Sequence, residues 1–173
     1  MTDGSPATLR RATAADAEAI ARAAVEAVAD YPDFAPPGWH GPTYEHELAD
    51  ARAVLGDAEY HCIVAELDGA VVGQVAVLPV ARAGRPVDDP TLAHLRNLFL
   101  DRSQWGSGLA SALMDAAMAD ARERGFAQMR LFVAEGQARA RRFYEREGWS
   151  AAGEPFDDPV PGLRMVEYRR RIG

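Results

Sequence analysis

Lysine is absent from this sequence, and all 19 of its strongly basic residues are arginine. A P-loop needs a lysine on the β- and γ-phosphates, and Schiff-base or pyridoxal chemistry needs a lysine amine, so the chain can do neither. The absence excludes many ATPases, kinases and aldolases. Cysteine is nearly absent too: Cys62 is alone, which excludes an internal disulfide and any multi-cysteine metal site, and we expect no metal.

Positive charge is also scarce. The sequence has 19 arginines and 26 aspartate and glutamate residues, which gives a formal net charge of −7, so we expect no generally basic nucleic-acid-binding surface. No apolar run approaches ~18 residues, and residues 1–6 have neither a basic start nor an apolar core of a leader, so we expect a cytoplasmic protein without a membrane partner. The length of 173 residues, with 48% apolar and 26% charged residues, predicts one globular domain over residues 1–173.

The hydrophobic patterns and the chain breakers predict a mixed α/β (α+β) fold, with helices on both faces of one sheet. The clearest local signal is Asp68-Gly69, a dipeptide favoured in tight hairpin turns. Long loops are expected over 31–42 and 81–90, which hold proline, glycine and charge. Strands are expected over 7–11, 60–67, 70–80, 93–100, 129–133, 149–154 and 163–170, and helices within 13–30, 43–55, 108–124 and 138–147.

A glycine turn joins the strand that ends at Leu100 to the following helix. Unpaired N–H groups in the first turn of a helix, with the positive end of the helix dipole behind them, form a site that suits phosphate. Gly106 and Gly108 allow a ligand to approach the main chain, and Ala110 keeps the helix start small. A plain structural turn is the alternative. A dinucleotide-binding turn is disfavoured because position 111 is serine, not the third glycine of that motif.

Two stretches together resemble the GNAT superfamily of N-acetyltransferases. Residues 98–100 followed by 104–113 (QWGSGLASAL) are similar to its acyl-CoA-binding signature, and residues 137–149 (QARARRFYEREGW) are similar to its second signature. They stand in the family's order and separation. Two positions depart from the family pattern: Trp105 replaces the usual glutamine or arginine, and Gln137 replaces the common asparagine, which puts a side-chain contact to the pantetheine arm in question.

The resemblance implies a mostly antiparallel twisted sheet of about six to seven strands and acetyl-CoA (coenzyme A) as cofactor. In that family the fourth strand splays from the fifth, so main-chain N–H groups of Phe99 and Leu100 would hold the thioester oxygen. Arg102, Arg139, Arg141 and Arg142 would meet the acidic ends of coenzyme A, or else pair with Glu145 and Glu147. The cofactor contacts that the resemblance implies are Leu98, Phe99, Leu100, Trp105, Gly106, Ser107, Gly108, Leu109, Ala110, Gln137, Arg139 and Phe143.

Acetyl transfer to an amine needs a proton acceptor for the amine and benefits from an acid for the departing thiol. The resemblance places Tyr144 as that acid; simple packing is the alternative. His94, four residues before Leu98, is the candidate base, because a neutral imidazole accepts a proton near pH 7; a structural histidine is the alternative. In an unbroken strand His94 and Arg96 share a face with Leu98 and Leu100, whereas a bulge would change that parity.

The acceptor side is the least defined. Aromatic residues crowd the loop between the first two helices, where the family lines its acceptor pocket: Tyr31, Phe34, Trp39, His40 and Tyr44. The 81–90 loop and residues 156–162 would close the site, and Asp157 and Asp158 would suit a cationic amine. We expect a small-molecule amine acceptor if the loops at 31–44 and 156–162 close the cleft, and a protein or peptide acceptor if they leave a groove. A non-catalytic acyl-CoA-binding module and a small nucleotide-binding protein are further alternatives, and the oligomeric state is expected to be monomer or homodimer.

Overall fold

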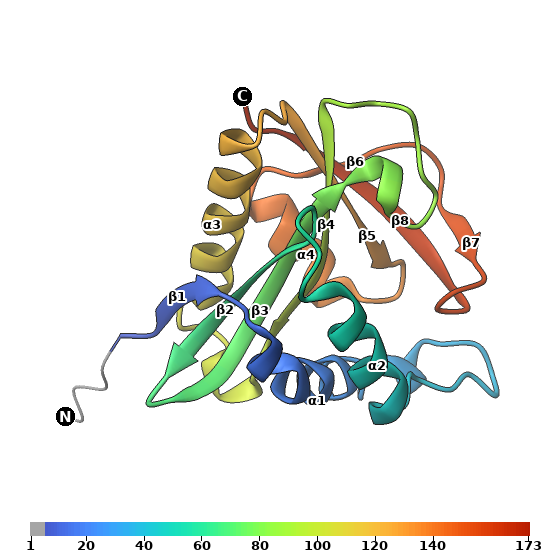
Figure 1. Ribbon diagram of the computed structural model, residues 1–173. Helices are drawn as coiled ribbons and strands as arrows, with labels where there is room; N and C mark the ends of the chain where they lie inside the picture. Colours follow the sequence, from blue (N-terminus) through green and yellow to red (C-terminus); the bar gives the residue numbers. More distant parts are fainter. Residues whose placement is uncertain (1–5) are drawn as a thin grey trace.

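The computed structural model describes residues 6–173, so most of the N-terminal segment considered above lies outside the described residues. One eight-stranded sheet runs in the order β1-β2-β3-β4-β5-β8-β6, and β7 also pairs with β8 (Figure 1). The strands are β1 (Thr8–Arg11), β2 (His61–Leu67), β3 (Ala70–Pro79), β4 (Leu92–Leu100), β5 (Gln128–Ala134), β6 (Ser150–Ala151), β7 (Phe156–Asp158) and β8 (Leu163–Arg171). The helices are α1 (Ala17–Ala27), α2 (Tyr44–Val54), α3 (Leu109–Glu123) and α4 (Ala138–Arg146), with short 3-10 turns at Ala14–Asp16, Tyr31–Asp33, Val80–Arg82 and Arg102–Gln104.

The predicted fold class is confirmed. Every strand pair is antiparallel except β4 with β5, and helices cover both faces of the sheet. Two details differ from the prediction. The strand expected over 149–154 is only two residues long, and part of the loop expected over 156–162 is strand β7. β7 pairs along its three residues with β8, the next strand along the chain, and three residues are too few to show a strand pattern in the sequence.

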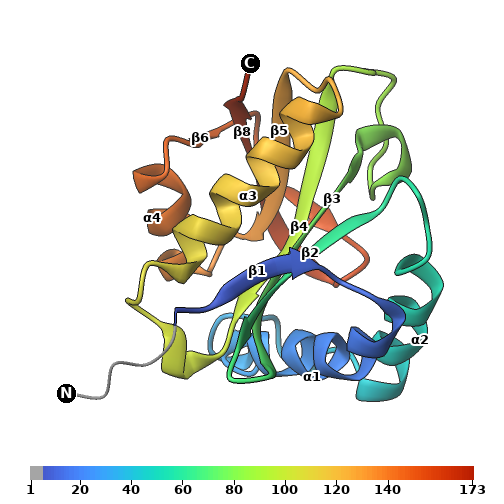
Figure 2. The same ribbon diagram turned by 60° about the vertical axis from the view of Figure 1, so that its left-hand side comes forward.

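The two faces of the sheet are packed by different helix pairs (Figure 2). α3 and α4 cover one face through a large apolar cluster, which includes Leu113, Met114, Leu131 and Tyr168 and continues along β2 to β5 and β8. α1 and α2 cover part of the other face through a smaller cluster formed by Ala17, Ile20, Ala51, Cys62, Val64 and Ala76. We call these the α3/α4 face and the α1/α2 face.

The β2–β3 hairpin follows the local signal. Asp68 and Gly69 have φ angles of 50° and 80°, so both central residues of the turn are left-handed, as a two-residue hairpin of this kind requires. The hairpin holds β3 beside β4, and β4 is the strand that carries the site.

A bulge interrupts β4 at Asn97. The β3–β4 register advances from Ala76↔Arg96 to Gln74↔Phe99, so β4 contributes one extra residue, and Asn97 has a φ angle of 56°. The bulge reverses the parity expected for an unbroken strand. Leu98 and Leu100 pack against the cluster of the α3/α4 face, as Leu95 does, whereas His94 belongs to the opposite face.

Beyond His94 the strands β4 and β5 separate. Their parallel pairing covers only Leu92↔Gln128 to His94↔Arg130, yet β4 continues to Leu100 and β5 to Ala134. The splay therefore leaves a V-shaped opening in the middle of the sheet, with His94 at its closed end.

Candidate active site

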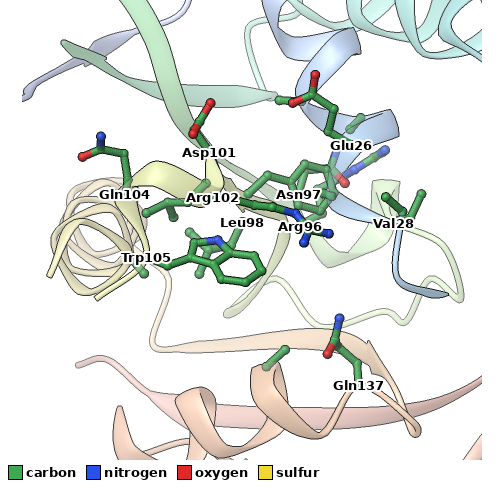
Figure 3. A pocket seen from close by; sticks show the side chains of 18 of the residues that line it. Glu26, Val28, Arg96, Asn97, Leu98, Asp101, Arg102, Gln104, Trp105 and Gln137 are labelled. Carbon is green, nitrogen blue, oxygen red and sulfur yellow. The ribbon is translucent and has the colours of Figure 1, made fainter. Parts of the chain in front are cut away.

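A cleft of about 1680 Å³ lies over the splay. Its walls come from α1 and the chain that follows it, from β4, from the glycine turn before α3, and from β5 and α4. Figure 3 shows Arg102, Gln104 and Trp105 together at the α3 end, with Gln137 on the opposite side of the cleft from Glu26 and Val28. Fourteen residues were predicted for the site, and twelve line this cleft: His94, Leu98, Phe99, Leu100, Trp105, Gly106, Gly108, Ala110, Gln137, Arg139, Phe143 and Tyr144.

Ser107 and Leu109 do not line the cleft. The Ser107 N–H donates to the Gln104 carbonyl at 3.2 Å, and its hydroxyl accepts the Leu109 N–H at 3.2 Å. The Leu109 side chain is buried in the cluster of the α3/α4 face. Both residues thus shape the turn, and neither offers an unpaired main-chain donor.

The glycine turn leaves other donors available. Gly106 and Gly108 have φ angles of 80° and 86°, and a Cβ atom at either position would meet nothing within 4 Å. Within residues 6–173 the N–H groups of Gly106, Gly108, Ala110 and Ser111 have no acceptor. These donors stand at the positive end of the fifteen-residue helix α3. An arrangement of this kind can donate hydrogen bonds to an anion with several negatively charged oxygens.

Arginine surrounds the same turn. The Arg139 guanidinium carbon lies 3.3 Å from the centroid of the Trp105 ring and that of Arg102 lies 5.2 Å from it. Arg102 also pairs with Asp30 at 2.5 Å. Trp105 thus holds two cations beside the glycine turn, at the position where the resemblance led us to expect glutamine or arginine.

The other predicted arginine contacts differ from the expectation. Arg142 lines the cleft, but Arg141 donates to the Glu135 carbonyl and to the Tyr168 hydroxyl. Neither Glu145 nor Glu147 pairs with these arginines: Glu145 accepts from Tyr168 at 2.8 Å and Glu147 from Ser111 at 2.7 Å. These two acids brace α4 against the sheet and α3.

Main-chain donors of β4 face the splay. The Asp101 N–H donates to the Val72 carbonyl of the strand beside β4. Because successive N–H groups of a strand point in opposite directions, Leu100 and Leu98 present theirs to the opening, and Phe99 presents its own to β3. Leu98 is thus better placed than Phe99 to share with Leu100 the role of holding a carbonyl oxygen.

Tyr144 reaches the cleft from α4. Its side chain is 8% exposed, and it packs among Phe143, Trp149 and Tyr168 at ring-centroid distances of 5.5 to 6.2 Å. Its hydroxyl has no hydrogen-bond partner within residues 6–173. Burial raises the pKa of Tyr144, so the phenol keeps its proton at neutral pH. A rigid, protonated and unpaired hydroxyl at the cleft is what a proton donor requires.

His94 lies at the closed end of the splay, and its surroundings disfavour the base role that was predicted for it. The residue is 6% exposed, and its Nδ1 atom accepts the Arg130 Nε–H at 3.2 Å. Burial, then the charges of Arg130 and Arg96, lower the pKa of His94 to about 3. An imidazole in this state is neutral at pH 7 and accepts a proton poorly.

Two loops meet at the wall of the cleft. The Trp39 indole N–H donates to the Pro161 carbonyl at 2.8 Å, and both residues line the cleft. Trp39 also stacks on Tyr31 at 5.8 Å, and Tyr31 contacts Phe34 at 4.9 Å. The predicted loops at 31–44 and 156–162 are thus joined by a hydrogen bond.

Sequence reasoning missed Arg130 and the consequence of Asn97. Arg130 stands alone between Met129 and Leu131 in an apolar strand, and the interruption of that pattern was the available signal. Asn97 could have been noticed because asparagine tolerates left-handed backbone better than most residues. Both residues act through partners that are distant along the chain, so neither pattern was decisive alone.

The described residues contain no cluster of three or more histidine, cysteine or acidic side chains that could hold a metal ion. Across residues 6–173, no helix has both the length and the apolar character needed to cross a membrane. Cys62 is buried, and burial raises the pKa of its thiol to about 12, so it is not a nucleophile at neutral pH.

The sequence model of the acetyltransferase (GNAT) family matches residues 21–149, a span that contains most of the cleft. The chain belongs to the acetyltransferase (GNAT) family. It is 34% identical over 97 residues to N-acetyltransferase 8 of Homo sapiens, a match that covers 54% of this chain and 40% of that protein. It is 31% identical over 123 residues to N-acetyltransferase family 8 member 3 of Rattus norvegicus, covering 68% of this chain and 51% of that protein. The chain thus matches about half the length of these relatives.

Solved structures of this GNAT fold are similar over almost the whole chain. An acetyltransferase of the GNAT family from Staphylococcus aureus has a TM-score of 0.74 at 14% identity, covering 96% of this chain and 99% of that one. The yncA structure from Salmonella typhimurium, solved with its cofactor acetyl-CoA, has a TM-score of 0.71 at 20% identity, covering 98% of this chain and 95% of that one. At these identities the similarity establishes the fold.

Proposed function

We propose that this GNAT protein transfers an acetyl group from acetyl-CoA to a primary amine of a small molecule, by direct attack in a ternary complex. Acetyl-CoA supplies a thioester whose acyl–sulfur bond breaks as the amine nitrogen bonds to the acyl carbon. The residues present fit this cofactor. The unpaired N–H groups at Gly106, Gly108 and Ala110 suit its diphosphate, and the splay of β4 from β5 has room for its extended arm.

The chain's own residues divide the remaining work. The Leu98 and Leu100 N–H groups would donate to the thioester oxygen, which gains negative charge during the reaction. Tyr144 would give its proton to the departing sulfur, since a thiol with a reference pKa near ~8.5 leaves more easily when protonated. Phe143, half-buried at the cleft, would pack on the pantetheine arm.

The proton of the amine needs a separate acceptor. An alkylammonium with a pKa near ~10.4 is free base in only about one part in a thousand at neutral pH. His94 has its Nδ1 lone pair occupied by Arg130, so the proposal assigns this proton to water in the open cleft and not to the imidazole.

The bond between Trp39 and Pro161 is the observation that favours a small acceptor. It joins the two loops that we propose border the acceptor, whereas a polypeptide acceptor would need a continuous groove between them. The single tryptophan of this loop, half-buried on Tyr31, would then form a wall of the acceptor pocket.

The test has two stages. Calorimetry with acetyl-CoA, ATP and NAD measures binding, and only acetyl-CoA is expected to bind at micromolar concentration. A panel of small amines and amine-bearing peptides, read out by release of free thiol, then identifies the acceptor class. Preference for ATP or NAD would point to a nucleotide-binding protein, and thiol release only with peptides would replace the small-molecule proposal. Acetyl-CoA binding without turnover on any amine would indicate a non-catalytic acyl-CoA-binding module.

A further inference from the structure

His94 rests on a buried arginine. Arg130, on the neighbouring strand β5, is 2% exposed and lies on the α1/α2 face of the sheet. Its Nη2 atom donates to the carbonyls of Gly84 and Arg85 at 2.7 Å each, and its Nε–H donates to the Nδ1 atom of His94 at 3.2 Å. Three acceptors therefore hold the guanidinium in one orientation.

This contact determines the tautomer of His94. A guanidinium only donates hydrogen bonds, so the Nδ1 atom must present its lone pair and the single hydrogen of the neutral ring must be on Nε2. Within residues 6–173 the Nε2–H has no acceptor, and His94 lines the cleft. The residue is 6% exposed, and its Nε2 atom is not one of the completely buried, unpartnered polar atoms of the described residues, so this N–H opens on the cleft, where a ligand can accept its hydrogen bond.

The imidazole ring is held in place by aromatic contacts. It lies edge-on to Phe132 at a centroid distance of 5.0 Å, and Phe132 contacts Phe156 of β7 at the same distance. The Arg85 guanidinium covers the Phe156 ring at 3.9 Å. The His94 Nε2–H is thus held in one orientation by a row of aromatic contacts that extends from Phe132 to Phe156 and Arg85.

The charges nearest this donor are positive. Arg130 of β5 and Arg96 of β4 act directly on the imidazole and disfavour its protonation. The acidic groups of the region act on the arginines: Glu167 of β8 on Arg130, and Glu47 of α2 on Arg96. The positive potential that keeps His94 neutral would also stabilise an anionic oxygen placed on its Nε2–H.

The position of His94 points to the acceptor and not to the cofactor. β4 runs from His94, where pairing with β5 ends, towards Leu100 and the glycine turn. Leu100 follows His94 by six positions along the strand, which corresponds to ~20 Å in a fully extended strand. The bulge at Asn97 shortens this distance. The diphosphate site lies beyond that end, so a ligand at His94 belongs to the acceptor half of the cleft.

We propose that the His94 Nε2–H binds a carboxylate oxygen of the acceptor, so that the preferred substrates are amines that carry a carboxylate, as free amino acids do. This inference rests on the proposed acetyl transfer and names the chemical class of its acceptor. His94 is then a specificity-determining residue and not a base.

The tautomer is tested on the protein alone. Long-range ¹H–¹⁵N spectra of the imidazoles, with His94→Gln used to assign the signal, should show a bare Nδ1 and a protonated Nε2 that do not change between pH 5 and pH 8. The signals of His40 and His46, which are exposed, provide an internal comparison in the same spectra. A hydrogen on Nδ1, or titration of His94 near its ordinary value, would overturn the proposal whatever the enzyme's activity.

The ligand class is tested by product binding in the presence of coenzyme A. A panel of N-acetyl amino acids is compared with the matching acetamides that lack the carboxylate. At least one N-acetyl amino acid should shift the His94 Nε2–H resonance and bind at least tenfold more tightly than its partner. His94→Phe should remove this preference, His94→Gln should keep part of it through its amide N–H, and the affinity for coenzyme A should stay within twofold for both.

Equal binding of each pair, or no shift of His94 with any of the panel, refutes the carboxylate subsite. A loss of coenzyme A affinity in both His94 variants would instead place His94 at the cofactor and refute the proposal on that ground. Failure of the wild-type protein to bind coenzyme A is a separate result, which refutes the acetyl-transfer function itself.

Discussion

The two faces of the sheet differ in what they bury. The α3/α4 face is covered by an apolar cluster in which Leu113, Met114 and Met129 are completely buried. The α1/α2 face has a much smaller apolar cluster, and beside it the sheet buries polar groups: Gln74, His94 and Arg130 are 1%, 6% and 2% exposed. One face is a scaffold, and the other contains oriented hydrogen-bonding groups.

The difference matches the two halves of the cleft. The α3/α4 face supports the elements that surround the glycine turn, where main-chain N–H groups are available as donors and the Arg102 and Arg139 side chains lie beside them on Trp105. The α1/α2 face supports the half of the cleft that we propose binds the acceptor, where the donors include the His94 side chain. A site made of main-chain N–H groups keeps its donors when side chains are substituted, so its ligand preference persists. A site made of side chains loses or changes its donors when those side chains are substituted, so its ligand preference changes. Variants on the two sides should therefore fail in different ways.

The largest effect is expected at the glycine turn. Gly108→Asp places a carboxylate where the diphosphate is proposed to bind and a side chain at a φ angle of 86°, so the Kd of acetyl-CoA should rise at least a hundredfold in calorimetry. Gly125→Asp is the matched control, because Gly125 has the same φ angle and open space at the other end of α3. Retained affinity in Gly108→Asp would move the cofactor away from this turn.

A smaller effect is expected at Tyr144. Tyr144→Phe removes only the hydroxyl, so kcat on a working amine should fall at least tenfold while the affinity for acetyl-CoA stays within twofold. Tyr168→Phe is the control, since its buried hydroxyl donates to Glu145 outside the cleft. If turnover in Tyr144→Phe matches that of the control, Tyr144 is not the acid.

Asp16, at the start of α1, is expected to contribute to the free energy of unfolding. Asp16 accepts two hydrogen bonds from Arg10 at 2.9 Å and one from the Thr13 N–H at 2.7 Å, and the Arg10 contacts lower the pKa of Asp16 below its ordinary value of 3.8. Because the folded pKa is the lower one, this stabilisation is complete above the unfolded pKa and is lost as pH falls through the folded pKa.

Asp16→Asn should therefore lower the free energy of unfolding by about 1–2 kcal/mol at pH 7 in urea titrations, and the difference should shrink as the pH falls through the lowered pKa of Asp16. Asp88→Asn, in the exposed loop after β3, should change it by less than about 0.5 kcal/mol. A pH-independent difference at position 16 would attribute the effect to packing and not to charge.

The smallest effect is expected at the loop bridge. Trp39→Phe keeps a ring on Tyr31 but loses the hydrogen bond to Pro161, which is worth about 1 kcal/mol, so the KM of a small amine should rise about three- to fivefold with kcat within twofold. Val160→Ala, in the same loop and 80% exposed, should leave both constants unchanged. A fall in kcat at constant KM would assign Trp39 to chemistry and not to acceptor binding.

Local signals predicted the fold well. The hairpin at Asp68-Gly69 and the glycine turn before α3 were predictable because the required backbone angles are properties of a few adjacent residues. The strand β7 was missed because its three residues are held by pairing with β8. The side of the sheet taken by Leu98 could not be assigned, since one left-handed residue, Asn97, reverses the parity of all that follows in β4.

Residue identity alone thus predicted the order of the main strands and helices, excluded lysine and disulfide chemistry, and predicted the glycine turn before α3, because each depends on near neighbours in the chain. Folding in three dimensions decided the rest. It joined the two loops that carry Trp39 and Pro161, and it placed Arg130 beside His94, so that the Nδ1 atom accepts a hydrogen bond and the ring hydrogen is on Nε2. Both contacts join residues more than 30 positions apart, and the state of a histidine depends on its partner in space and not on its neighbours in sequence.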